Sequence, residues 1–180
     1  MTDREAWHIA VAAVTEEFAR LSPSRRAFVG EGAEAVKSAK QALHAIVEEV
    51  TAEGICASCG GECCRTGKFH FTVVDLLVYL ADSRELFTPR FGQEACPYLG
   101  VLGCLMAPAY RPYNCITFNC ERLELLLAPD EKECLAGHEE RLRSHYQRFE
   151  EFFGARFLGG LLMTWERHVV RGRTTILGGA

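Results

Sequence analysis

Apolar side chains recur at intervals of three and four residues along much of the chain, a spacing that predicts α-helices. The first such stretch runs from Thr2 to about Arg20, and the second runs from about Ala33 to Glu53. Between them, Ser22 and Pro23 suit the first positions of a helix, because Ser caps the amino end and Pro is tolerated in the first turn. The two glycines between Arg25 and Gly32 predict a frayed or bent start to the second helix.

Helices are also predicted in the second half of the chain. Thr72 and Asp75 are spaced as in a capping box and precede an apolar run, which predicts a helix from about Val73 to Asp82. Three more helices are expected over 116–127, 130–153 and about 157–170, and residues 171–180 are expected to form a loose tail. The buried face predicted for 130–153 consists of Cys134, Leu135, Leu142, Tyr146, Phe149 and Phe153.

Residues 83–116 differ from these helical stretches, because Pro and Gly recur too closely for a long regular element. These residues are Pro89, Gly92, Pro97, Gly100, Gly103, Pro108 and Pro112. A coil of this length needs another reason to be ordered, since long structureless loops are uncommon inside compact domains. We expect a bound metal to supply that reason.

The helical spacing predicts a mainly α fold. Length and composition predict a single domain over residues 1–180, since 180 residues with 48% hydrophobic content can bury one substantial core. Within it we expect a helical N-terminal part, an irregular cysteine-rich metal-binding loop region, a helical C-terminal part and a tail. The boundaries of these four parts are 1–54, 55–120, 121–170 and 171–180. The net charge of −4 provides no overall field to attract nucleic acid or an anionic membrane, so neither is an expected partner.

The N-terminus lacks the basic start and apolar run of a secretory signal, and no apolar stretch is long enough to span a bilayer. A cytoplasmic location is therefore expected. The cytoplasm keeps thiols reduced, so nine cysteines there predict metal ligation in preference to disulfides. Because nine is an odd number, at least one thiol is left over, and Cys134 stands apart from the rest.

The other eight cysteines fall into two clusters. Thiolates two residues apart can bind the same ion, and Gly60 and Gly61 let the backbone close around the first cluster. The expected metal ligands are therefore Cys56, Cys59, Cys63 and Cys64 in the first cluster, and Cys96, Cys104, Cys115 and Cys120 in the second.

Eight thiols allow three arrangements: one zinc on four sulfurs, two zincs on all eight, or an iron–sulfur cluster held by four. Spacing does not choose between zinc and an iron–sulfur cluster. Side chains of adjacent residues diverge, so we expect only one of Cys63 and Cys64 to share a metal with Cys56 and Cys59. The fourth ligand is then expected from the second cluster.

The cysteine pattern also resembles a known family. The residues concerned are Cys56-x2-Cys59-x3-Cys63-Cys64, Cys96-Pro97, Gly103-Cys104 and Arg111-Pro112-x2-Cys115 with Cys120. Residues 54–120 are similar to the YkgJ-type cysteine-cluster family, which is described as a zinc- or iron-chelating domain. The resemblance implies that both clusters bind metal.

Three functions are compatible with these residues. The leading hypothesis is a metal-binding protein that coordinates zinc or an iron–sulfur cluster. An iron–sulfur-dependent redox or methyl-transfer enzyme is the first alternative, since a flagellin lysine methylase family carries a related cysteine cluster. A metal chaperone or buffer is the second. No catalytic residue can be assigned from the sequence.

Several polar residues near the clusters could serve these functions. An enzyme would need polar groups near the metal, and a thiolate site needs cations to offset its negative charge. His70 could contact a thiolate, although its Phe neighbours favour packing, and we expect Asp75 to act as a helix cap. The candidates for an enzyme site are His70, Asp75, Tyr110, Arg111 and Asn114, and those for charge compensation are Arg65, Lys68 and Arg111.

Overall fold

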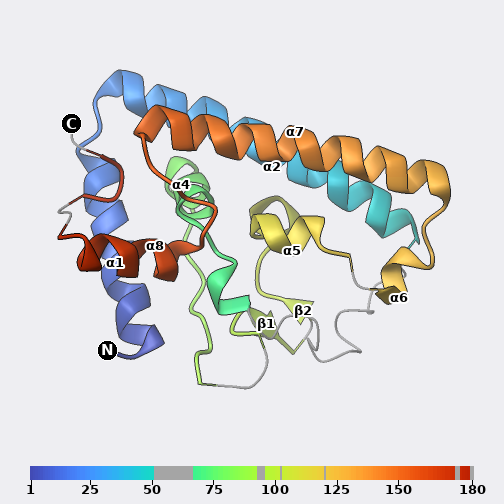
Figure 1. Ribbon diagram of the computed structural model, residues 1–180, viewed down its shortest axis with the longest axis horizontal. Helices are drawn as coiled ribbons and strands as arrows, with labels where there is room; N and C mark the ends of the chain where they lie inside the picture. The colour runs from blue at the N-terminus through green and yellow to red at the C-terminus, as the bar shows by residue number, and fades with distance from the viewer. Residues whose placement is uncertain (51–66, 93–95, 102, 120, 173–174, 179–180) are drawn as a thin grey trace.

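The computed structural model describes residues 1–50, 67–92, 96–101, 103–119, 121–172 and 175–178, and these are mainly helical. Two long helices, α2 (Pro23–Val50) and α7 (Pro129–Phe153), run antiparallel along one side of the molecule (Figure 1). The shorter α4 (Val73–Ala81) packs against α2, and α1 (Asp3–Ala19) packs against α8 (Leu161–Val170). We call these five helices the helical frame.

The predicted starts of α1 and α4 are confirmed, and each begins with a capping box. In α1, the Thr2 amide donates to the Glu5 carboxylate at 2.6 Å, and the Glu5 amide donates to the Thr2 hydroxyl at 3.2 Å. Thr72 and Asp75 make the same reciprocal pair at α4, with distances of 2.9 and 3.1 Å. Both boxes satisfy amides that a helix start otherwise leaves without partners.

The prediction of a frayed or bent start to the second helix is wrong. Helix α2 begins at Pro23 and continues through Gly30 and Gly32 without a break. A Cβ at position 32 would lie 2.6 Å from the Phe149 ring of α7, so the glycine there allows the two long helices to approach closely. The predicted end at Glu53 lies outside the described residues.

The prediction of a single helix over residues 116–127 is also wrong. The chain forms two short helices, α5 (Tyr113–Thr117) and α6 (Glu121–Glu124), and Phe118 between them has extended backbone angles. The leucine run that suggested one helix does not form one buried face, because Leu125 is 78% exposed and Leu126 is 51% exposed.

Helix α7 ends as predicted at Gly154, whose φ of +62° is the left-handed conformation that glycine adopts easily. Its predicted buried face is confirmed with one exception. Cys134 is an exposed free thiol, whereas the next residue, Leu135, is buried. Successive residues on a helix point in directions about 100° apart, so only Leu135 faces the core here.

Helix α8 begins at Leu161, later than the predicted Phe157. The amide of Leu158 instead donates to the Glu150 carboxylate at 3.0 Å. Gly160 has a φ of +78°, and a Cβ there would overlap the Phe69 carbonyl oxygen, so only glycine fits this turn. The chain thus enters α8 directly against the segment that precedes α4.

The prediction of a loose tail is wrong for residues 175–178. Ile176 and Leu177 are buried, and their amides donate to the Glu17 carboxylate at 2.8 and 2.7 Å. An Arg25 guanidinium nitrogen lies 3.4 Å from the Leu177 carbonyl. Two apolar side chains and three hydrogen bonds therefore fix this segment against α1 and α2.

Between α4 and α7 the described elements are short, as the Pro and Gly content predicted. Strands β1 (Leu99–Gly100) and β2 (Gly103–Cys104) form an antiparallel hairpin in which Leu99 lies opposite Cys104. A 3₁₀ turn, η3 (Pro108–Tyr110), follows, and another, η2 (Gly67–Phe69), precedes α4. The hairpin and both turns were not predicted.

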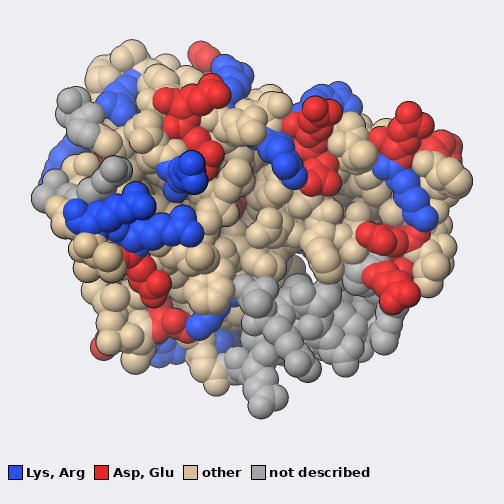
Figure 2. Space-filling view, in the orientation of Figure 1, with Lys and Arg blue, Asp and Glu red and all other residues tan. Residues whose placement is uncertain are grey.

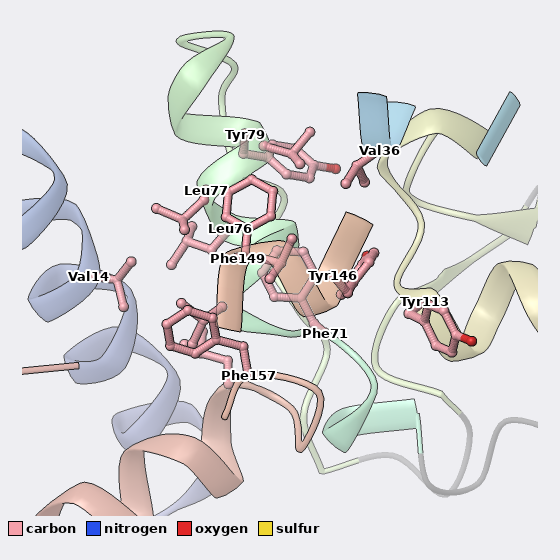
Figure 3. Close-up of a cluster of buried hydrophobic side chains, with 14 of the residues drawn as sticks. Val14, Val36, Phe71, Leu76, Leu77, Tyr79, Tyr113, Tyr146, Phe149 and Phe157 are labelled. Atoms are coloured by element: carbon pink, nitrogen blue, oxygen red, sulfur yellow. The ribbon is translucent and has the colours of Figure 1, made fainter. Parts of the chain in front are cut away.

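One apolar core connects these elements (Figure 3). Phe71 lies near its centre, with its ring centroid 5.1 Å from that of Trp7 and 5.4 Å from that of Phe87. Tyr146 and Phe149 supply the contribution of α7.

Within the described residues, no helix combines the length and apolar composition that crossing a bilayer requires.

Candidate metal centre

The described cysteines of the second cluster come from three separate places: a loop, a strand and a helix. Cys96 is buried just before β1, Cys104 is half-buried in β2, and Cys115 is half-buried in α5. The remaining predicted ligands lie outside the described residues: Cys56, Cys59, Cys63, Cys64 and Cys120.

The turn η2 contacts the region around Cys96. A Cβ at Gly67 would lie 2.6 Å from the Cys96 sulfur, so the turn backbone packs directly against this thiol. The next residue, Lys68, accepts a hydrogen bond at its carbonyl from the Tyr98 hydroxyl at 3.1 Å. Because η2 begins immediately after the first cysteine cluster in the sequence, these contacts connect the two cysteine-bearing parts of the chain.

His70 brings a ring nitrogen to the second cluster. Its Nδ1 lies 3.4 Å from the Cys115 sulfur, and its amide donates to the Gly67 carbonyl at 2.9 Å. Burial lowers the pKa of the His70 imidazole, so the neutral form, which can ligate metal, is favoured. The sequence favoured packing between phenylalanines for His70, whereas the structure places its ring beside a thiol.

Cys96 and Cys115 both lie close enough to the buried Tyr98 to influence its hydroxyl. Burial is the main cause that raises the pKa of its hydroxyl, and negative charge on Cys115 and Cys96 raises it further. The hydroxyl therefore stays protonated and donates to the Lys68 carbonyl. Cys96 and Cys115 are distant in sequence, yet both lie close enough to one buried ring to affect it.

Cys104 has different neighbours. Its sulfur lies 3.5 Å from the Met106 amide nitrogen, which donates to it. Burial raises the pKa of Tyr79, and negative charge on Cys104 contributes a smaller increase. In the part of the chain that the structure describes, no three His, Cys, Asp or Glu side chains form a group that could hold a metal ion.

The cations predicted to offset thiolate charge have other partners. The Lys68 ammonium pairs with Asp3 at 2.7 Å. Arg111 donates from Nε to the Met106 carbonyl at 3.4 Å, and Arg65 lies outside the described residues. Whether these cations also offset thiolate charge stays a prediction.

Two of the polar groups considered for an enzyme site are also engaged elsewhere or point to solvent. The Tyr110 hydroxyl donates to Asp82 at 2.6 Å. Asn114 is exposed on α5. Of the five candidates, only His70 has a described contact with a cysteine sulfur.

Asp75 belongs to a buried polar network that the sequence did not reveal. Its Oδ1 accepts from the Lys40 ammonium at 2.7 Å and from the Tyr146 hydroxyl at 2.6 Å, while Oδ2 accepts from Thr72. The side chains of Lys40 and Asp75 are both fully buried. The network joins α2, α4 and α7 at the first turn of α4, from which His70 and η2 extend. Asp75 thus caps the helix, as predicted, and also pairs with a buried cation.

The burial of Lys40 could have been inferred from the spacing of apolar residues along α2. Lys40 lies four residues after Val36 and three before Leu43, two core residues on the same side of α2. A lysine at such a position needs a buried acidic partner, because an unpaired buried charge is strongly unfavourable. Asp75 was the natural candidate for that partner, because the capping pattern already placed its carboxylate at the start of an apolar helix.

Together these features describe a mainly helical protein in which a cysteine-bearing segment is held against a helical frame. Comparison of the chain with protein-family models, with curated proteins and with solved structures finds no match. The function therefore rests on the residues and their geometry.

Proposed function

We propose that the protein binds zinc or an iron–sulfur cluster through cysteines of both clusters. The single observation that carries the proposal is the position of η2 and His70. Gly67 packs against the Cys96 sulfur, and the His70 ring lies 3.4 Å from the Cys115 sulfur. The segment that continues directly from the first cluster thus contacts two thiols of the second.

Covalent geometry supports convergence of the two clusters. Cys64 stands three positions before Gly67 and Cys63 stands four before it. Even a fully extended chain spans only about 3.6 Å per residue, so the Cα of Cys64 stays within about 11 Å of that of Gly67. The length of chain between them therefore permits the Cys64 thiol to approach Cys96, against which Gly67 packs.

The chemistry of the donors supports zinc or an iron–sulfur cluster over other metals. Thiolate sulfur and imidazole nitrogen are the ligands that zinc prefers in structural sites, and iron–sulfur clusters are held mainly by thiolates. Carboxylates, which calcium and magnesium prefer, are engaged elsewhere in this region, since Asp75 pairs with Lys40 and Asp82 pairs with Lys37. The resemblance to the YkgJ-type cysteine-cluster family supports the same conclusion.

The test is metal and acid-labile sulfide analysis of anaerobically purified protein, together with its visible spectrum. We expect either zinc in a colourless protein or iron with sulfide in a brown one. C96A and C115A should each lose most of the bound metal. C134A is the matched control, because Cys134 is exposed on α7, and it should keep the metal content of the natural chain.

Two outcomes would contradict the proposal. One is a protein that stays metal-free after growth with added zinc and iron. The other is unchanged metal content in both C96A and C115A, with a far-UV circular dichroism spectrum showing that the helices are intact.

The same measurements separate the alternative functions. Colourless protein with tightly held zinc would exclude an iron–sulfur-dependent redox or methyl-transfer enzyme. Brown protein with acid-labile sulfide would keep that enzyme under consideration and exclude a plain zinc site. Zinc that exchanges within seconds with a coloured chelator would favour a metal chaperone or buffer over a structural site.

A further inference from the structure

A cavity of about 510 Å³ lies between the start of α1 and the loop that follows α4. Its volume is within the range of small-molecule sites in proteins. Arg4 and Arg90 line it, together with apolar residues that include Phe87, Phe91 and Leu105. Among the cysteines that the structure describes, neither Cys96, Cys104 nor Cys115 lines the cavity, so it is separate from the described part of the candidate metal centre.

The two arginines are available to a ligand. Neither guanidinium has a hydrogen-bonding or ion-pair partner among the described contacts. The acidic residues beside Arg4 are engaged elsewhere, because Asp3 pairs with Lys68 at 2.7 Å and Glu5 accepts from the Thr2 amide at 2.6 Å. Both cations therefore face the same cavity without a neutralising carboxylate among the described residues.

The apolar wall is preformed. The Phe87 and Phe91 rings pack against Trp7 of α1, with centroid distances of 5.9 and 6.0 Å. The Arg90 amide donates to the Pro97 carbonyl at 2.8 Å, which fixes the backbone between the two phenylalanines. Leu105 is 39% exposed and contributes apolar surface to the same cavity.

We propose that this cavity binds a small organic anion, in which a carboxylate or phosphate group is attached to an aromatic or other apolar body. Guanidinium groups form strong paired hydrogen bonds with carboxylate and phosphate oxygens, so Arg4 and Arg90 are suited to hold the anionic group. The phenylalanine rings and Leu105 would cover the apolar body. The cavity therefore matches a ligand that has both an anionic group for the arginines and an apolar body for the wall.

The test is calorimetric titration of the full chain with phenyl phosphate, benzoate, inorganic phosphate and benzyl alcohol. We expect saturable binding of phenyl phosphate, benzoate or both, and weaker binding of the other two. Binding of phenyl phosphate alone would identify the group as phosphate, and binding of benzoate alone would identify it as carboxylate.

Arg4→Gln and Arg90→Gln should each weaken binding about tenfold, which corresponds to loss of one charged hydrogen-bonding group. Leu105→Glu should weaken it at least as much by placing a like charge in the cavity, whereas Leu105→Gln should change it less. Arg20→Gln is the matched control, since Arg20 lies at the other end of α1 and pairs with Glu16.

The proposal is overturned if neither aromatic anion binds saturably, or if inorganic phosphate binds as tightly as phenyl phosphate. It is equally overturned if Arg20→Gln weakens binding as much as Arg4→Gln and Arg90→Gln, because the attraction would then be general. Metal content is not expected to change in these variants, so failure here is distinguishable from failure of the proposed metal function.

Discussion

The helical frame and the cysteine segment, which we define as residues 67–72, 96–101 and 103–117, are held in place by different means. Helices α1, α2 and α7 are 17, 28 and 25 residues long, and their apolar stripes meet in a shared core. In the cysteine segment, the described helices, strands and turns are two to five residues long. The frame therefore supplies long apolar stripes to the core, whereas the cysteine segment supplies single core side chains, such as Phe71 and Tyr98, from short elements and loops.

Charge is arranged differently on the surface of the molecule and inside the helical frame. On the face shown in Figure 2, Lys and Arg side chains are interspersed with Asp and Glu. At the junction of α2, α4 and α7, by contrast, one cation and one carboxylate are fully buried together. The comparison teaches that the frame uses one costly buried pair to fix the start of α4, and that this start positions His70 and η2.

Metal removal should have the largest effect and should act on the cysteine segment. Binding energies of structural zinc are on the order of ten kcal/mol, so a chelator should increase hydrogen exchange over residues 96–117 much more than within α2 and α7. Exchange measured by mass spectrometry before and after chelation tests this. Equal protection in both states would contradict a structural metal.

Loss of the buried cation should have the next largest effect. Lys40→Met leaves the Asp75 carboxylate buried without its partner, which should lower the free energy of unfolding by about 3–5 kcal/mol. Urea titration gives this value. Lys37→Met is the matched control, because Lys37 pairs with Asp82 but its side chain is 16% exposed.

The control should lose much less stability. The double variant K40M/D75N should recover part of the loss, since it removes the uncompensated charge. A loss in Lys40→Met no larger than in Lys37→Met would show that the network does not hold the frame together.

One glycine in each region packs so closely against a neighbouring side chain that an added methyl group would clash with it. A Cβ at Gly67 would lie 2.6 Å from the Cys96 sulfur, and a Cβ at Gly32 would lie 2.6 Å from the Phe149 ring. Gly67→Ala and Gly32→Ala should each lower the free energy of unfolding by about 1–3 kcal/mol, as overpacking does. Only Gly67→Ala should also reduce the metal content.

Gly30→Ala is the control for these variants, because no atom lies within 4 Å of a Cβ at that position. In a helix, alanine is favoured over glycine by about 1 kcal/mol, so this change should stabilise the protein. Thermal unfolding and metal analysis test all three variants. Equal metal loss in Gly32→Ala and Gly67→Ala would contradict the distinction between the regions.

The smallest expected effect concerns the contact that joins the two regions. Asp82, at the end of α4, accepts from Lys37 of α2 at 2.7 Å and from Tyr110 of η3 at 2.6 Å. Burial would raise the pKa of Asp82, but these hydrogen bonds outweigh it, so its pKa lies below the ordinary 3.8.

Because the folded-state pKa is lowered, the stabilisation is fully present above pH 3.8 and is lost as the pH falls through the folded-state value. We expect a loss on the order of 1 kcal/mol at the acid end of this window. Urea titrations at pH 5 and at lower pH measure it. Asp82→Asn should show a smaller decrease over the same window, and an equal decrease would remove Asp82 as its cause.

Much of the frame was predictable from local sequence. Repeats of three and four apolar residues predicted α1 and α7, and the Thr72 and Asp75 pair predicted the start of α4. These predictions succeeded because capping and helical periodicity depend on residues that are neighbours in the chain.

The errors arose where distant residues decide the local structure. Gly32 reads as a helix breaker until Phe149 is packed against it, and Ile176 and Leu177 read as a loose tail until Glu17 binds their amides. In both places, the stabilising contact comes from a residue more than a hundred positions away.

The sequence by itself determined the helical content of the frame, the caps of α1 and α4, and the two groups of cysteines. Only the tertiary structure decided that Lys40 is buried against Asp75, and that η2 and His70 lie beside Cys96 and Cys115. The physical reason is that helix periodicity and capping act over three or four residues, whereas pairing a buried charge or bringing thiols together requires the chain to fold back on itself.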